Sequence, residues 1–320
     1  MTTVIDAPVA KDGLYLRATP NTFSVVDTTI NMHGGRAGII TDMEPQPAYL
    51  APVMRSVEIN VMDGHGHQTL WGIRRHKLRS PLCESIEVTD YTPAEATLQT
   101  TWMKEHAFYD EIESGDAVYR NCRAFNIPAQ FIQIRLAGNR KDVMWPNRRA
   151  ILIEKCEGWE VGQLRGAGRA GFAISVKDSG PEGEVVIAGT ALETINQRAV
   201  KKTSGGVMAD SFGAICVEYA KTCLIERCEI NYRNPANHAI QLYDFANKAK
   251  GKTGPEEIVV QDCTLAPGNN IALRIEASTK RVEVAGCKGQ GQIIVYKMNA
   301  SGIYGVARRI PIASGFKYRA

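Results

Sequence analysis

The sequence predicts an all-β protein: a single stack of parallel strands, coiled into about nine turns with long loops between them. Short segments in which apolar and polar residues alternate are typical of strands with one buried face. One such segment returns at intervals of 24 to 38 residues, and a second short apolar segment follows most copies. Repetition at this period indicates stacked units that bury their faces on one another.

The clearest copy lies within residues 222–244, where an apolar segment at 224–230 carries Cys228 and a second one follows at 239–243. A β-sandwich of many short strands has the same alternation, but it does not explain the regular return of the Cys228 position. Since a buried free cysteine behaves as a small hydrophobe, this position suits a narrow interior. Aligning the copies predicts one inward residue in each turn: Thr28, Met62, Tyr91, Cys122, Cys156, Thr190, Cys228, Cys263 and Cys287.

The repeats cover residues 22–298, which we interpret as one domain because a repeat stack is a single unit at any length. Residues 1–21 are expected to form an irregular arm. Residues 299–320 are expected to form a C-terminal extension that either caps the stack or reaches a neighbouring subunit. Long loops, the first of them with a short helix or an extra strand as alternatives, are expected at 92–116, 136–150, 191–212 and 245–257.

Composition excludes several classes of partner. The chain has 320 residues, with 38 Lys and Arg against 34 Asp and Glu, and its formal charge of +4 is too small to favour nucleic acid. No apolar run approaches the roughly 18 residues of a membrane helix, and the first residues lack the apolar core of a secretory signal. We therefore expect no membrane or nucleic-acid partner and synthesis in a cytoplasm.

The chain has eight cysteines, and five of them occupy the repeated inward position. Cys83, Cys216 and Cys223 lie off that position. An inward, apolar setting favours reduced thiols, although stacked turns would hold neighbouring cysteines close enough to leave pairing open.

The pattern apolar-x-apolar-x-x-Cys, as in residues 151–156, 258–263 and 282–287, resembles that of the right-handed parallel β-helix superfamily with pectate-lyase-like folds. The resemblance covers about residues 22–298 and implies a right-handed coil. The superfamily includes polysaccharide lyases, glycoside hydrolases, epimerases and many bacteriophage tailspike and virion proteins. Because the pattern describes packing, it indicates a fold and not an activity.

Residues 63–67 read Asp-Gly-His-Gly-His. A Gly-His-Gly occurs in polygalacturonase-like hydrolases of this superfamily, but the acidic motifs that precede it there are missing here. The catalytic role is therefore not carried over, and a glycine-rich bend with exposed histidines is the simpler interpretation. Two histidines one residue apart would need a third ligand to hold a metal, and the sequence does not indicate one, so no metal is predicted.

Residues 166–171 match the GxGxxG pattern of dinucleotide-binding proteins. That motif requires a following helix whose N-terminus holds the pyrophosphate, whereas residues 172–176 have the pattern of a strand. No nucleotide cofactor is predicted.

If the protein is an enzyme, the candidate catalytic residues are Asp63, His65 and Asp244, which end or follow predicted strands. Arg135 and Arg274 lie on or just after second strands and are placed to share one outer face. The basic run at 74–79 would meet an anionic sugar, an acidic partner or only water.

The sequence therefore favours a non-enzymatic structural or host-attachment protein of a phage-like particle. It would be located in the virion as a homotrimer, beside other virion proteins, and would contact bacterial surface polysaccharide. The alternative is a polysaccharide depolymerase, either a lyase or a glycoside hydrolase, with its site in a groove between loops.

Overall fold

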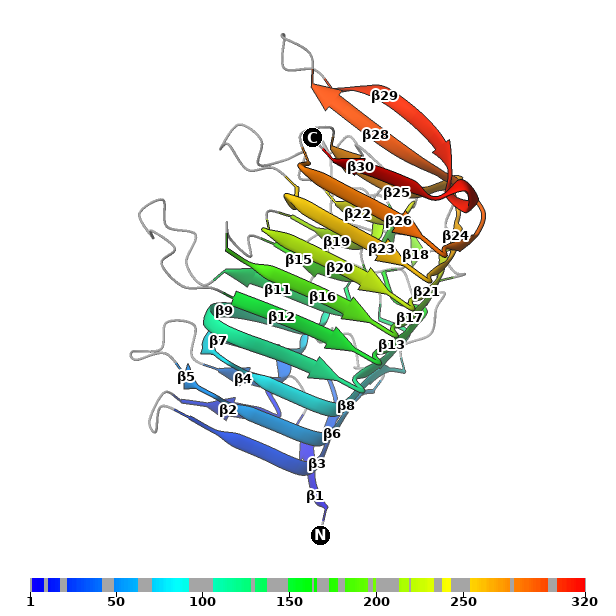
Figure 1. Cartoon of the computed structure of the whole chain (residues 1–320). Coiled ribbons are helices and arrows are strands. Elements are labelled where there is room, and N and C mark those ends of the chain that lie inside the picture. The colour runs from blue at the N-terminus through cyan, green and yellow to red at the C-terminus, as the bar shows by residue number, and fades with distance from the viewer. Residues whose placement is uncertain are drawn as a thin grey trace.

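The chain forms an all-β structure in its computed structural model (Figure 1). One large, mostly parallel sheet contains 28 strands, and β14 (Leu164–Arg165) and β18 (Arg198–Ala199) form a separate pair. The predicted all-β, mostly parallel fold is therefore confirmed. The structure describes residues 2–8, 11–17, 22–41, 49–62, 71–91, 106–127, 130–136, 149–162, 164–165, 173–177, 182–194, 198–199, 213–218, 220–232, 238–242, 254–276, 279–298 and 304–319.

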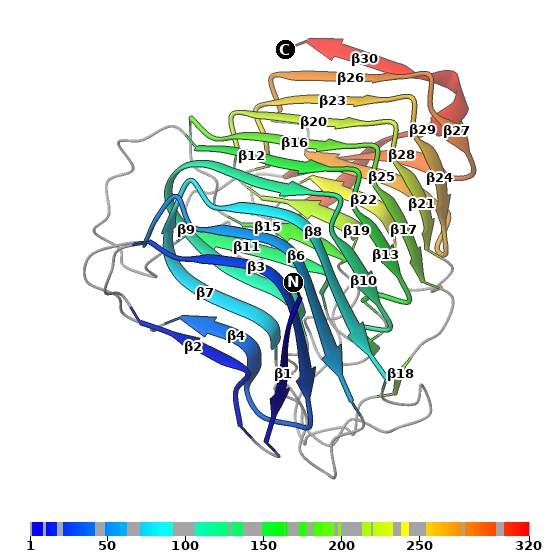
Figure 2. The same cartoon turned by 90° about the horizontal axis from the view of Figure 1, so that it is seen from below.

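The large sheet has three columns of strands, and within each column successive strands pair in parallel (Figures 1 and 2). The first column contains β3 (Ser24–Met32), β6 (Val53–Val61), β8 (Leu82–Asp90), β9 (His106–Arg120), β12 (Arg149–Glu154), β16 (Glu184–Ala188), β20 (Thr222–Glu226), β23 (Glu257–Gln261) and β26 (Arg281–Ala285).

The second column continues from the ends of β3, β6 and β8. Its other strands are β1 (Thr3–Ala7), β10 (Arg123–Phe125), β13 (Glu157–Trp159), β17 (Ala191–Thr194), β21 (Glu229–Tyr232), β24 (Thr264–Pro267) and β27 (Lys288–Gly289).

The third column includes the beginning of β9. Its other strands are β2 (Leu14–Leu16), β4 (Ala37–Thr41), β5 (Tyr49–Leu50), β7 (Trp71–Arg79), β11 (Ile132–Leu136), β15 (Ile174–Val176), β19 (Gly213–Val217), β22 (His238–Leu242), β25 (Ile271–Glu276) and β28 (Gln292–Met298).

A residue in the left-handed backbone conformation lies at each corner between the first and second columns. A single residue with positive φ turns the chain there, and at five corners its N–H continues the ladder; Lys155 N, for example, donates to Ala188 O at 2.9 Å. Non-glycine residues rarely adopt this conformation, so a repeated series of them defines the corner. The series is Asp27, Ser56, Ser85, Asn121, Lys155, Gly189, Arg227, Asp262 and Gly286, with φ between 49° and 63°.

The residue after each corner points into the core. The strand register gives this inward series as Thr28, Val57, Ile86, Cys122, Cys156, Thr190, Cys228, Cys263 and Cys287, all buried. Seven of the nine predicted positions are therefore correct. Met62 and Tyr91 are wrong: they lie just past the ends of β6 and β8, and they are 37% and 55% exposed. The actual positions are five residues earlier, because these long strands continue past the corner.

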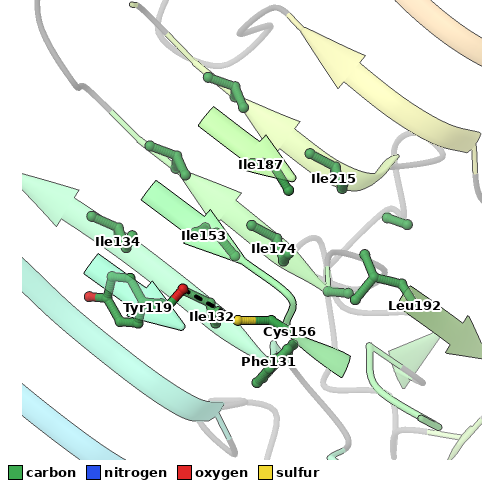
Figure 3. Close-up of a cluster of buried hydrophobic side chains, with 14 of the residues drawn as sticks. Tyr119, Phe131, Ile132, Ile134, Ile153, Cys156, Ile174, Ile187, Leu192 and Ile215 are labelled. Carbon is green, nitrogen blue, oxygen red and sulfur yellow. Dashed lines mark hydrogen bonds between the residues drawn. The ribbon is translucent and has the colours of Figure 1, made fainter. Parts of the chain in front are cut away.

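The interior is one continuous apolar cluster along the stack. Figure 3 shows part of it, where Ile153 and Ile187 of the first column face Ile132 and Ile174 of the third. The Sγ of Cys156 donates to the carbonyl of Tyr119 at 3.5 Å. All eight cysteines are free and buried, and five of them occupy the inward series that follows the corners.

One ion pair lies inside this apolar interior. Arg75 Nε donates to Asp110 Oδ1 at 2.9 Å, Arg75 Nη2 donates to Oδ2 at 2.5 Å, and both side chains are fully buried. The hydroxyl of Tyr119 also donates to Asp110. Burial alone would lower the pKa of Arg75, but the charge and hydrogen bonds of Asp110, together with Cys83 and Tyr119, outweigh burial, and the pKa lies well above its ordinary value. The expectation that the whole run at 74–79 lies outside is therefore wrong for Arg75, which follows Ile73 to the inner side by strand alternation.

The two ends of the stack are built differently. Residues 3–7 and 14–16, expected to be irregular, form β1 and β2, which extend the second and third columns in parallel. At the other end, β29 (Tyr304–Pro311) and β30 (Phe316–Arg319) flank a short 3-10 turn (Ile312–Ser314). They pair antiparallel with β28 and β26, the last strands of the third and first columns. Figure 1 shows them at the end opposite the N-terminus.

Several predicted loops extend less far than expected. A loop, a short helix and an extra strand were the three possibilities for residues 92–116. Residues 106–116 belong to the long strand β9, so this part of the segment is a strand. Residues 191–194 form β17, and Glu257 begins β23. Residues 92–105, 137–148, 200–212 and 245–253 lie outside the described residues.

The corner geometry predicts how Arg227 responds to substitution. Arg227→Val should lower the free energy of unfolding by about 1–2 kcal/mol, because a β-branched side chain resists positive φ. Arg227→Gly should be nearly neutral, because relief of strain is offset by the flexibility of glycine when unfolded. Denaturant titration measures both. Glu229→Val, at an exposed strand position two residues later, is the control and should change stability by less than about 0.5 kcal/mol.

The buried ion pair makes a second prediction. Asp110→Leu alone should cost about 3–5 kcal/mol, because it leaves the Arg75 guanidinium buried without its carboxylate. The triple variant Arg75→Met, Asp110→Leu, Tyr119→Phe should recover most of that loss, because no buried polar group is then left over. A triple variant as unstable as Asp110→Leu would show that the loss comes from packing instead.

Candidate functional site

The predicted catalytic residues Asp63, His65 and Asp244 lie outside the described residues, as does the GxGxxG segment at 166–171. The structure therefore does not test whether they come together.

Polar side chains gather on the outer face of the third column. Because side chains alternate along a strand, Ile132, Ile174 and Ile215 point into the core and their neighbours point outward. The register aligns the outward neighbours in one row: Arg74, Tyr109, Gln133, Ser175, Cys216, Gln241 and Arg274. Most of this row is buried although it lies outside the core. An outer face that is both polar and buried differs from an ordinary solvated strand surface.

The first group on this face, the His76 cluster, consists of Arg74, His76, Tyr109, Glu111 and Arg135. His76 Nδ1 lies 2.9 Å from Glu111 Oε2, and Arg74 Nε donates to His76 Nε2 at 3.0 Å. From the other side, Arg135 Nη1 donates to the Tyr109 hydroxyl at 3.1 Å, and that hydroxyl lies 3.5 Å from Glu111 Oε1. Both hydrogen-bond chains therefore end on the carboxylate of Glu111.

The strands explain why these residues meet. β7 supplies Arg74 and His76, and β9 supplies Tyr109 and Glu111 at the neighbouring register positions. Arg135 of β11 lies directly opposite Glu111. The guanidinium of Arg74 also lies over the Tyr109 ring, 5.6 Å from its centroid. Partial burial lowers the pKa of Arg74 from its ordinary value.

The His76 cluster has the elements of acid–base chemistry on a negatively charged ligand. A carboxylate beside an imidazole can accept and return a proton. Two guanidinium groups at its edges can neutralise negative charge on a ligand or a transition state. The arrangement is equally suited to binding an anionic group without reaction.

The second group, the His238 cluster, consists of His238, Asn269, Arg274 and Tyr296. Arg274 Nη1 lies 2.8 Å from His238 Nε2, which accepts because a guanidinium only donates. The Asn269 amide lies 2.8 Å from His238 Nδ1. The guanidinium of Arg274 lies 4.5 Å from the centroid of the Tyr296 ring, a cation–π distance.

Buried polar atoms without partners lie between the two groups. Ser175 Oγ and Gln241 Oε1 form no hydrogen bond in the described part of the chain, although both residues are at least 95% buried. Ser175 and Gln241 lie on either side of Cys216 in the row, and Gln241 is directly opposite Arg274. A buried polar atom without a hydrogen-bond partner costs free energy unless a ligand or a water molecule bonds to it. A water molecule that reached Ser175 Oγ or Gln241 Oε1 would complete these atoms.

Sequence reasoning found part of this site. Arg135 and Arg274 were predicted to share an outer face, and the register places both on the outer side of the third column. It missed the pairing of His76 with Glu111, since the two residues are brought together only by the β7–β9 register. Trp159 lies in the second column, where its ring stacks on Phe125 with ring centroids 5.0 Å apart.

Within the ranges that the structure describes, no set of three His, Cys, Asp or Glu side chains is arranged to hold a metal ion. No helix in those ranges is long and apolar enough to cross a membrane.

Comparisons of the chain with models of known protein families, with curated proteins and with solved structures give no match. The site must therefore be interpreted from its own chemistry.

The orphan hydroxyl of Ser175 predicts a gain in stability when it is removed. Ser175→Ala should raise the free energy of unfolding of the ligand-free protein by about 1 kcal/mol, because it removes a buried polar group that lacks a partner.

Thr194→Val is the matched control, because the hydroxyl of Thr194 is equally buried but donates to the carbonyl of Val161. That variant should lose about 1 kcal/mol. Thermal and denaturant unfolding measure both, and equal losses in the two variants would mean that Ser175 is satisfied in solution.

Proposed function

We propose that the chain is a right-handed parallel β-helix of about nine turns, of the pectate-lyase-like superfamily, and that it serves as a glycan-contacting attachment or structural protein of a phage-like particle. The support for the coil is the series of nine corner residues that begins with Asp27 and ends with Gly286. The support for the function is the polar strip on the outer face of the third column.

The strip has the chemistry that a polysaccharide requires. Sugar hydroxyls both donate and accept hydrogen bonds, and the partly exposed side chains of Tyr109, Glu111 and Arg135 offer complementary groups. Arg135 and Arg274 add positive charge, and Tyr296 adds an aromatic face. Three strand steps separate β11 from β22, about 14 Å at the usual strand spacing of about 4.8 Å, so one extended chain can contact both clusters.

A stack of paired strands is also a rigid support for contact with a surface. Each described column extends over many strands, and the interior is packed with apolar side chains from end to end. In the proposed setting the chain would be a homotrimer located in the virion, beside other virion proteins. Bacterial surface polysaccharide would be its ligand.

The alternative is a polysaccharide depolymerase, and one observation favours it: Glu111 receives hydrogen bonds through both His76 and Tyr109 and lies between two arginines. A lyase or hydrolase needs such an acid–base group beside charge-neutralising cations. Asp63, His65 and Asp244 remain additional candidates for this activity.

Binding should depend on the two arginines. Arg135→Ala and Arg274→Ala should each weaken binding to the bacterial polysaccharide that the protein recognises by about tenfold or more, because each removes a charged hydrogen-bond donor. Glycan-array screening followed by calorimetry measures this. Arg123→Ala is the control, because Arg123 is an exposed residue of the second column paired with Glu157. An equal loss for Arg123→Ala would place binding elsewhere.

Depolymerisation of the same polysaccharides separates the two functions. An attachment protein should leave chain length unchanged. If cleavage occurs, Glu111→Gln should reduce kcat at least a hundredfold if Glu111 transfers the proton, while Asp63→Asn and Asp244→Asn test the other candidates. Cleavage that survives all three substitutions would exclude these residues as the catalytic set.

A further inference from the structure

Three cysteines occupy consecutive inward positions at the C-terminal end of the stack. The register opposes Glu229 to Thr264 and Thr264 to Lys288, so the preceding residues Cys228, Cys263 and Cys287 form one line. All three are free and buried. A second pair, Cys122 and Cys156, is opposed in the same way in the middle of the stack.

The spacing of neighbouring strands suits a bond between these thiols. Paired strands lie about 4.8 Å apart, within the range of about 4.4–6.8 Å between Cα atoms that a disulfide requires. Directly opposed parallel positions hold the two side chains side by side, so a bridge there would be strained. Strained disulfides are the readily reduced ones.

Each thiol reaches toward the preceding turn of the stack. Cys263 Sγ donates to the carbonyl of Ile225 on β20 at 3.7 Å, and Cys287 Sγ donates to the carbonyl of Val260 on β23 at 3.7 Å. The neighbouring Cys263 thiol and burial raise the pKa of Cys287 above its ordinary value, so we expect its oxidation to be slow.

Access distinguishes the end of this line from its middle. Cys287 is 8% exposed, the largest value among the eight cysteines, whereas Cys122 and Cys156 are fully buried. Cys287 also belongs to the last position of the series, next to the short strand β27. A small solute reaches Cys287 first.

We propose that Cys263 and Cys287 form a reversible disulfide when the protein meets a small two-electron oxidant such as a peroxide. The peroxide oxidises the Cys287 thiol to a sulfenic acid and is reduced to water. The sulfur of Cys263 then attacks the Cys287 sulfur, the S–O bond breaks, and the hydroxide leaves with the Cys263 proton as a second water. A thiol reductant restores both groups.

The bond would connect the last two turns of the stack. It would tie β24 to β27 covalently where only a few backbone hydrogen bonds join them. Since the ends of a repeat stack open most easily, the crosslink would slow local opening of this end.

The test is to oxidise the folded full-length protein with hydrogen peroxide, quench, denature in an alkylating agent, digest and map disulfides by mass spectrometry. The expected result is one bridge, Cys263 to Cys287, with six of the eight thiols still alkylated and full recovery after dithiothreitol. Hydrogen exchange of residues 281–289 should slow in the oxidised form.

Three cysteine variants test which thiols form the bridge. Cys287→Ser and Cys263→Ser should each abolish the bridge, and Cys122→Ser should leave it unchanged. Oxidation that first joins Cys122 to Cys156, joins Cys228 to Cys263 while Cys287 stays reduced, or stops at separate oxidised cysteines would overturn the proposal.

Discussion

The whole structure depends on one backbone constraint, a single residue with positive φ at each corner between the first and second columns. From Asp27 to Gly286 this residue turns the chain, and at five corners, from Asn121 to Asp262, its N–H donates to the next strand. The turn points the following side chain into the core, where space favours Thr, Val, Ile or Cys. Because every corner repeats the geometry, the strands on both sides stay in register, and the positions of all other side chains follow.

The sequence predicts those features of the fold that depend on local residue patterns, and it misses those that depend on contacts between distant residues. The alternation and the returning small residue are local, so they predict parallel repeats and seven inward positions correctly. Met62 and Tyr91 were misplaced because β6 and β8 continue past their corners, and the apolar pattern has no break there. Ser56 and Ser85, small polar residues inside apolar segments, were the signal that could have marked the corners. The inward position of Arg75 was hidden, because its partner Asp110 lies a whole turn away.

In the candidate site, too, the local features were predicted and the long-range contacts were not. Sequence reasoning placed Arg135 and Arg274 on one face, since their position within a strand is a local property. It did not pair His76 with Glu111 or find the orphan atoms of Ser175 and Gln241, which depend on the register of strands far apart in the chain. The inner face holds the apolar core and the line of cysteines. The outer face of the third column holds the polar groups that we propose as a ligand site.

The most direct test of the account is a set of distances along the corner series. Spin labels on unnatural amino acids would replace Arg227 and, in separate samples, Asp27, Ser56 and Ser85, so the native thiols stay unlabelled. Six, five and four strand steps predict separations of about 29, 24 and 19 Å, falling by one strand spacing at each step. Distances that do not shorten in this order, as in two packed sheets with crossing connections, would contradict the stacked corner and every position inferred from it.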